Sequence, residues 1–346
     1  MHDFKFEVIM KNLLMFFYIV LFSISVQSAE WVSPIDKKYI AKDPVNFADF
    51  DKARDILNSW RGQGEKLRKA DVLLKKVLAK DSDFAPAYRE YGRLYIMAGH
   101  INYDNFKQGS LNPSEAAINR SLEIEPEYAD SYVLLGHLYT KMKRYKDAED
   151  ALKKAESIGT EIPWLDLNWA GVLEKKRKYK EAMHRYEKVV NSGTVNTKAY
   201  AVALSGKTTM HMYMGQFSKA NDGYKKEIEN EPDSAWNWSN YAEFLLFRYD
   251  DVDGAIKHGR EALKRMNFGA GRFLLGSALY TKWAQLKIEG DKDVLAQEYF
   301  DQAWSIYPYP EQVINKAKRH GYTQQTAQEL QKWLLINKNK EASNRR

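Results

Sequence analysis

Residues 131–158 read SYVLLGHLYTKMKRYKDAEDALKKAESI and contain two consecutive amphipathic helix patterns. In the first pattern, Leu135 and Tyr139 stand four residues apart and share one helix face. Gly136 and Ala148 are small where two antiparallel helices would press together, because bulk at these points would hold the backbones apart. The stretch therefore predicts one pair of closely packed helices.

The same register recurs along the chain. A small residue of the second helix returns after gaps of 44, 34, 34, 38, 35 and 41 residues. We expect turns between helices to absorb the longer gaps. The seven small residues are Ala70, Ser114, Ala148, Ala182, Ala220, Ala255 and Ala296.

This pattern resembles the tetratricopeptide-repeat family, whose repeat is two antiparallel helices over about 34 residues. The resemblance covers about residues 50–310, and its best matches are SLEIEP at 121–126 and the series Ala296, Phe300, Ala303 and Pro308. His211 and Gly259 depart from it, since they stand where an aromatic and a bulky residue are usual. The resemblance implies an all-α fold, an α-solenoid of about seven helix pairs.

A solenoid needs a cap over its last exposed layer. Two shorter helical patterns follow the last repeat, and we interpret them as this cap. The expected organisation is a signal peptide at 1–29, an N-terminal linker at 30–45, the solenoid at 46–310, capping helices at 311–337 and a basic tail at 338–346.

The N-terminal segment is typical of a secretory signal. Leu13–Val26 is a fourteen-residue apolar run preceded by Lys11 and followed by small residues. Cleavage would fall after Ser28 or Ala29, and the chain would be periplasmic or secreted. An uncleaved anchor and a start at Met10 instead of Met1 remain open alternatives.

Composition restricts the partners. The net charge of +7 is concentrated in the C-terminal 36 residues, which carry eight basic and three acidic side chains. The rest of the chain therefore offers no broad basic face for nucleic acid. Membrane contact is expected only through the signal segment or the basic tail (Lys332, Lys338, Lys340, Arg345 and Arg346). Cysteine is absent, which excludes disulfides, thiolate metal sites and cysteine nucleophiles.

Two stretches exceed the repeat length. Gly99–Asn112 separates the helices of the second pair and is rich in turn-forming residues. It is either a binding loop or a tolerated surface insertion. Lys287–Asp293 is expected to lengthen the turn of the last pair.

Catalytic signatures are missing from the sequence. The seven histidines are scattered without metal-ligand spacing, and no nucleophile elbow or phosphate-binding loop occurs. We therefore expect a protein that is not an enzyme, with no cofactor and no metal.

The resemblance also implies where a partner would bind, because the first helices of the repeats line a concave groove. Arg89 and Arg93 are four residues apart and could jointly hold a carboxylate; ordinary solvated charge is the alternative. The carboxylate clamp of chaperone-binding members is not reproduced, since Leu134 stands where asparagine is expected. The expected groove residues are Arg89, Arg93, Asp130, His137, Trp164, Glu174, Trp236, Ser239, Glu243, Phe273 and Tyr280.

These observations favour an exported adaptor that binds a protein partner in its groove and helps to assemble a cell-envelope complex. The alternative is a scaffold that contacts polysaccharide during cell-wall or exopolysaccharide export, with groove aromatics stacking on sugar rings.

Overall fold

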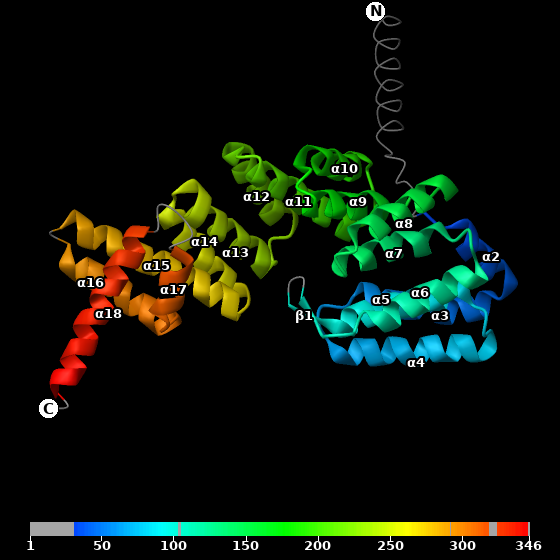
Figure 1. Cartoon of the computed structure of the whole chain (residues 1–346), viewed down its shortest axis with the longest axis horizontal. Helices are drawn as coiled ribbons and strands as arrows, with labels where there is room; N and C mark the ends of the chain where they lie inside the picture. The colour runs from blue at the N-terminus through cyan, green and yellow to red at the C-terminus, as the bar shows by residue number, and fades with distance from the viewer. Residues whose placement is uncertain (1–30, 103–104, 291, 318–323, 345–346) are drawn as a thin grey trace, which may run out of the picture. The chain divides into compact units, whose positions relative to one another are not determined.

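The chain divides into two compact units at Ala203–Leu204. The computed structural model describes residues 31–102, 105–290, 292–317 and 324–344 (Figure 1). The expected signal peptide at 1–29 lies outside the described residues.

The first unit consists of helix pairs that follow a short N-terminal helix. Their bounds are α2 (Pro34–Lys42), α3 (Pro44–Asn58) with α4 (Gly64–Lys80), α5 (Ala85–Gly99) with α6 (Asn112–Ile124), α7 (Ala129–Lys141) with α8 (Tyr145–Ile158), and α9 (Trp164–Lys175) with α10 (Tyr179–Asn191). Between α5 and α6, β1 (His100–Asn102) and β2 (Asn105–Phe106) pair as an antiparallel ribbon.

Helix α11 (Thr197–Tyr213) crosses the division, and its C-terminal half packs on α12 (Phe217–Asn230) through Thr208 and Gly223. The second unit continues with α13 (Ala235–Phe244), η1 (Leu245–Tyr249), α14 (Val252–Arg265), α15 (Gly269–Glu289), α16 (Asp293–Ile306), α17 (Pro310–Ala317) and α18 (Gln324–Asn344). The described residues thus contain seven helix pairs, one helix before them (α2) and two after them (α17 and α18), which confirms the α-solenoid.

The small residue of each second helix is the point of closest packing. All seven predicted small residues, from Ala70 to Ala296, are fully buried. Within each unit, first helices of successive pairs also contact one another, as α7 does α9, more extensively than second helices do. The face carrying the first helices is therefore the inner face of each unit.

The turn inside a pair has a constant geometry. Lys143, Arg177, Gly215 and Asp250 each adopt a positive φ, and each precedes the small residue by five positions. A left-handed residue at this point ends the first helix and reverses the chain.

The expectation that turns absorb the insertions is correct for the second pair, where the β1–β2 ribbon lies, but wrong for the fifth and last pairs. Helix α11 begins 18 residues before its left-handed residue, whereas α7 begins 14 residues before its own. The extra four residues are about one helical turn. Lys287–Glu289 belongs to α15, so the insertion of the last pair is largely helical and not a longer turn. Trp283 and Leu286 are buried, which gives the lengthened helix an apolar face.

The single extra residue of the sixth pair is absorbed by a π-turn. In η1, the amide of Asp251 donates to the carbonyl of Leu245 at 3.0 Å, six residues back. The equivalent bond in the third pair joins Arg144 to Tyr139 at 2.8 Å, five residues back. The wider turn preserves the register of the following helix.

The ends of the array differ from the expected boundaries. Residues 34–42, expected as linker, form α2, which begins at a Ser33 cap: its hydroxyl accepts from the amide of Asp36 at 2.9 Å. At the other end, α18 continues to Asn344 through most of the stretch expected as a tail.

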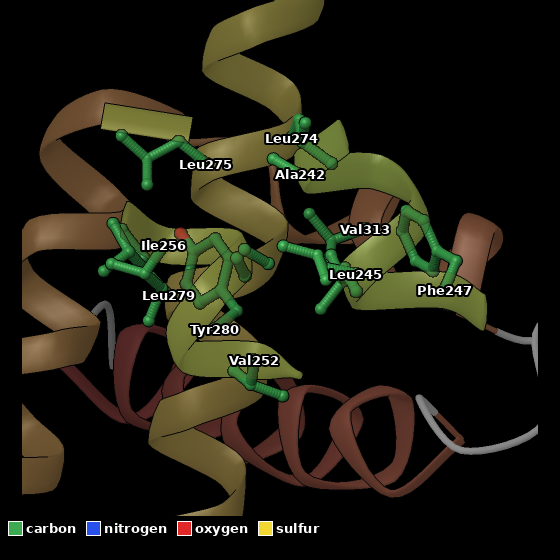
Figure 2. Close-up of a cluster of buried hydrophobic side chains, with 14 of the residues drawn as sticks. Ala242, Leu245, Phe247, Val252, Ile256, Leu274, Leu275, Leu279, Tyr280 and Val313 are labelled. Atoms are coloured by element: carbon green, nitrogen blue, oxygen red, sulfur yellow. The ribbon is translucent and has the colours of Figure 1, made fainter. Parts of the chain in front are cut away.

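The terminal helices α17 and α18 contribute to the core of the second unit. Val313 and Leu330 are buried in the same cluster as residues of α13–α16, and Trp333 lies against Phe300 at 4.7 Å between ring centroids. Figure 2 shows Leu245, Tyr280 and Val313 in this cluster. No helix in the described part of the chain is long and apolar enough to cross a membrane.

Two helix-interior glycines offer a matched test of the repeat register. A Cβ on Gly136 would lie 2.6 Å from Leu152, whereas a Cβ on Gly171 would meet no atom within 4 Å. Gly136→Leu should lower the free energy of unfolding by about 1–3 kcal/mol, since Leu152 is fully buried and must move. Gly171→Leu should leave it unchanged or raise it, because leucine favours helix over glycine. Thermal unfolding of both variants decides this, and equal melting temperatures would contradict the assigned register.

Candidate partner-binding site

Three of the predicted groove residues of the first unit, Arg89, Arg93 and Asp130, meet in a buried ionic network. Helix α2 supplies Asp36, whose carboxylate accepts from Arg54 of α3 at 3.0 Å and from the hydroxyl of Tyr128 at 2.6 Å. Tyr39 of α2 donates to the carbonyl of Asp83 at 2.7 Å. Helix α2 therefore lies against the residues that lead into α5 and α7, and the network joins four helices.

Arg89 and Arg93 do hold a carboxylate, as their spacing suggested, but it is an internal one. The two oxygens of Glu90 accept from Arg89 at 2.6 Å and from Arg93 at 2.7 Å. Arg89 also approaches Asp130 at 3.4 Å, and Asp130 accepts from Thr160 at 2.9 Å. These internal partners neutralise the arginines that were predicted to form a basic entrance to the groove.

Burial and charge compete at Glu90, which is fully buried. Burial alone would raise the pKa of this carboxyl, but Arg93, Arg89 and Arg54 outweigh it and hold the pKa below its ordinary value. At Asp130 burial prevails over Arg89 and raises the pKa. The network therefore fixes the side chains on this part of the inner face and leaves little free charge for a partner.

Farther along the inner face, the predicted residues are partly exposed. Nδ1 of His137 lies 3.3 Å from the side-chain oxygen of Asn168 on the next first helix. Trp164 is half-buried against the core of the third pair, and Glu174 accepts from Tyr186 at 3.3 Å. Between them, Gly171 faces open space. This part of the inner face is accessible.

In the second unit the predicted residues separate into two groups. Trp236 is 46% exposed with its ring 4.6 Å from that of Phe268, and Glu243 is exposed. Ser239 is buried, and Tyr280 is fully buried, with its hydroxyl donating to the carbonyl of Tyr307 at 3.3 Å. Tyr280 therefore belongs to the core and not to a surface, because α15 is lengthened and packed against α16 and α18.

Phe273 lies between these two groups. It is partly buried, with its ring 5.3 Å from that of Tyr307. Packing inside the last pair accounts for this contact.

Glu227 is an unusual buried residue that the sequence pattern did not single out. Glu227 occupies the position, seven residues after the small residue, that Ala155, Ala262 and Ala303 occupy in other pairs. It is 3% exposed, and neither carboxylate oxygen has a hydrogen-bond partner in the described structure. The clue was available in the repeat alignment, as a charged residue at an alanine position.

Metal binding has no evident site: within the described ranges, no group of three or more histidine, aspartate or glutamate side chains is arranged to hold an ion.

Comparison with known proteins agrees with this geometry. Residues 129–158 match the family model described as Tetratricopeptide repeat. A pentatricopeptide repeat-containing protein of Arabidopsis thaliana is 33% identical over 76 residues. That match spans 22% of this chain and 10% of the relative.

Solved structures show the same fold at low identity. The Cut9–Hcn1 hetero-tetramer of APC/C aligns with a TM-score of 0.56 and 16% identity, covering 71% of this chain and 45% of that one. Pseudomonas aeruginosa pilF aligns with a TM-score of 0.51 and 17% identity, covering 73% and 98%. PilW, a type IV pilus biogenesis factor, aligns with a TM-score of 0.51 and 17% identity, covering 65% of this chain and 94% of that one.

The fold and the matched repeat define a helical-repeat scaffold, a class that is typically non-catalytic. Residues 129–158 are a tetratricopeptide repeat by this match, and the described chain has the fold of tetratricopeptide-repeat proteins.

Glu227 makes stability depend on pH. Burial raises the pKa of this carboxyl above its ordinary value of 4.5, and the nearby hydroxyls of Thr208 and Ser205, which do not reach hydrogen-bonding geometry with it, offset this only in part. The folded state keeps the proton on Glu227 to a higher pH than the unfolded state does. The stability that this proton contributes is therefore complete below the pKa of the unfolded state. It declines as pH rises through the raised folded pKa. Glu227→Gln should match the wild type in free energy of unfolding near pH 4.5 and exceed it at pH 8.

Urea denaturation across this range measures the difference between the two proteins. Glu229→Gln, on the same helix and exposed, is the matched control. A Glu229→Gln difference that grew with pH as much as that of Glu227→Gln would show that the buried carboxyl is not the cause.

Proposed function

We propose that the protein is an exported scaffold that binds a segment of a protein partner on its inner face and assists assembly of a cell-envelope complex. The observation that carries the proposal is the accessible inner face of the first unit around Gly171, beside His137 and Trp164. Apolar and polar side chains side by side, on a rigid row of helices, suit recognition of a polypeptide segment. The pilus biogenesis factor PilW, whose fold is similar, supports the envelope role.

Export is proposed from the N-terminal sequence. Leu13–Val26 and the small residues after it have the pattern of a signal peptide. We expect the full chain, expressed in a bacterium, to be recovered outside the cytoplasm with a new N-terminus after Ser28 or Ala29. Cell fractionation and N-terminal sequencing measure this, and an intact chain confined to the cytoplasm would exclude export.

Partner binding is tested by blocking the inner face without unfolding it. Gly171→Leu adds bulk where the structure has open space, so the variant should fold but lose captured partner, by about tenfold if one contact region is blocked. The measurement is quantitative mass spectrometry of affinity captures from solubilised envelope. Lys146→Leu, at an exposed position on α8, is the control and should capture as the wild type does.

Equal capture by the wild type and Gly171→Leu would exclude the inner face of the first unit as the binding surface. Captured polysaccharide in place of protein, lost in the same variant, would favour the polysaccharide alternative. Exposed Trp236 beside Phe268 would then be the next surface to alter.

A further inference from the structure

An apolar groove opens on one side of the first helix pair of the first unit. It has a volume of about 460 Å³ and is lined by Ile56 of α3 and, on α4, by Glu65, Arg68, Lys69, Val72 and Leu73. Val72 is 65% exposed, and Ile56 and Leu73 are half-buried. Apolar surface is therefore left open between two helices. We call this surface the α3–α4 groove.

The groove lies on the side of α4 that faces away from the next pair. Asp71 accepts from the hydroxyl of Tyr91 on α5 at 3.1 Å, which places α5 on the other side of α4. Lys69 and Leu73 each stand two residues from Asp71, about 200° around the helix. In later pairs the second helix of the pair before packs on the first helix, as α6 does on α7 and α8 does on α9. The α3–α4 groove therefore lies where such a second helix would pack.

Cations outnumber carboxylates beside the groove. Asp49 stands seven residues before Ile56, on the same face of α3. Its carboxylate lies 3.9, 2.8 and 3.3 Å from the ammonium groups of Lys52, Lys76 and Lys80. One negative charge is thus shared by three positive charges, and two of these are left unbalanced.

The other charges at the groove add to this excess. Glu65 pairs with Lys69 at 2.7 Å, whereas Arg68 forms no ion pair among the described residues. The groove and its edge thus carry five cations and two carboxylates. The α3–α4 groove therefore suits an apolar surface that has acidic residues beside it.

A surface of this kind lies on α16, the second helix of the last pair. Val294 is 79% exposed, and Glu298 and Asp301, four and seven residues farther along the same face, are also exposed. Asp301 accepts from the side-chain amide of Gln297 at 2.8 Å, and neither carboxylate forms an ion pair among the described residues. Helix α16 contains no lysine or arginine, so this face is acidic. We call Val294, Glu298 and Asp301 the α16 stripe.

The α16 stripe and the α3–α4 groove match in spacing as well as in charge. Along α4, Arg68 and Lys76 stand about one helical turn before and one turn after Val72. Along α16, Glu298 stands about one turn after Val294. Placing one valine against the other therefore brings a carboxylate beside a cation whichever way the second helix runs.

We propose that the α16 stripe of one copy of the chain docks into the α3–α4 groove of a second copy. Burial of Val72 and Val294 supplies the apolar contact, and the opposite charges select the partner surface. The contact joins two different surfaces, so a dimer leaves one groove and one stripe free and further copies can add. The inference goes beyond the proposed function, since a row of copies offers several inner faces to one partner.

Sedimentation equilibrium of the full chain tests this association. A contact limited to one helix and one groove is expected to be weak, with a Kd of about 1–100 μM. The weight-average mass should rise with protein concentration, exceed that of a dimer, and fall as salt is raised, because salt screens the opposite charges. A mass that stays at that of the monomer well above this concentration range would overturn the proposal.

Two variants distinguish this contact from a symmetric one. Val72→Asp puts a carboxylate in the groove, and Val294→Lys puts an ammonium group in the stripe; both valines are exposed, so both variants should fold. Each variant alone should associate at least about tenfold more weakly than the wild type, since like charges then meet. An equimolar mixture should form a dimer and nothing larger, because one variant keeps its stripe and the other keeps its groove.

Ile101→Asp, at a 56% exposed position on β1, is the matched control and should associate as the wild type does. Equal weakening by Ile101→Asp would overturn the docking, because net charge alone would then explain the effect. A mixture of Val72→Asp and Val294→Lys that stays monomeric, or Val294→Lys that dimerises by itself, would overturn the contact between these two surfaces. All variants share the N-terminal apolar run, so association that none of them weakens would be assigned to that run and would overturn the proposal.

Discussion

The whole array depends on the contact between a small residue on one helix and a bulky residue on its partner. In the third pair, Leu152 fills the space that Gly136 leaves, and Ala148 lets the backbones approach. Dispersion and apolar burial act only at such short separations. Because each pair buries its faces against its neighbours, a fully buried small residue recurs in all seven pairs and no single central core is needed.

This constraint also governs where extra residues are tolerated. The fifth pair accommodates four residues, about one helical turn, at the start of α11, which leaves the following contacts in register. The sixth pair accommodates one residue, less than a turn, and a π-turn is the local solution. Only the largest insertion leaves the helices and forms the β1–β2 ribbon. Insertions that preserve helix phase remain helical, which sequence spacing alone did not reveal.

The fold was predictable because its signal is repeated. Seven small residues in one register outweigh local departures such as His211, and their complete burial follows from the periodicity. The site was less predictable, because a groove position in the repeat states which way a side chain points and not whether internal partners already bind it. Arg89 points as expected, but its partners Glu90 and Asp130 come from its own helix and from the next pair. Helix α2, outside the repeat pattern, closes that network through Asp36.

The same reasoning explains why the meeting of Arg61 and Arg93 could not be found from sequence. Arg61 lies in the turn after α3 and Arg93 lies on α5, and the repeat register does not state which side chains of neighbouring pairs share a partner. The structure supplies the missing relation, since both arginines donate to Asn58 at the end of α3. Fixed repeats thus define the shape of the inner face of the first unit, while residues outside the repeat consensus define its charge. A partner that binds this face must match both its shape and its charge.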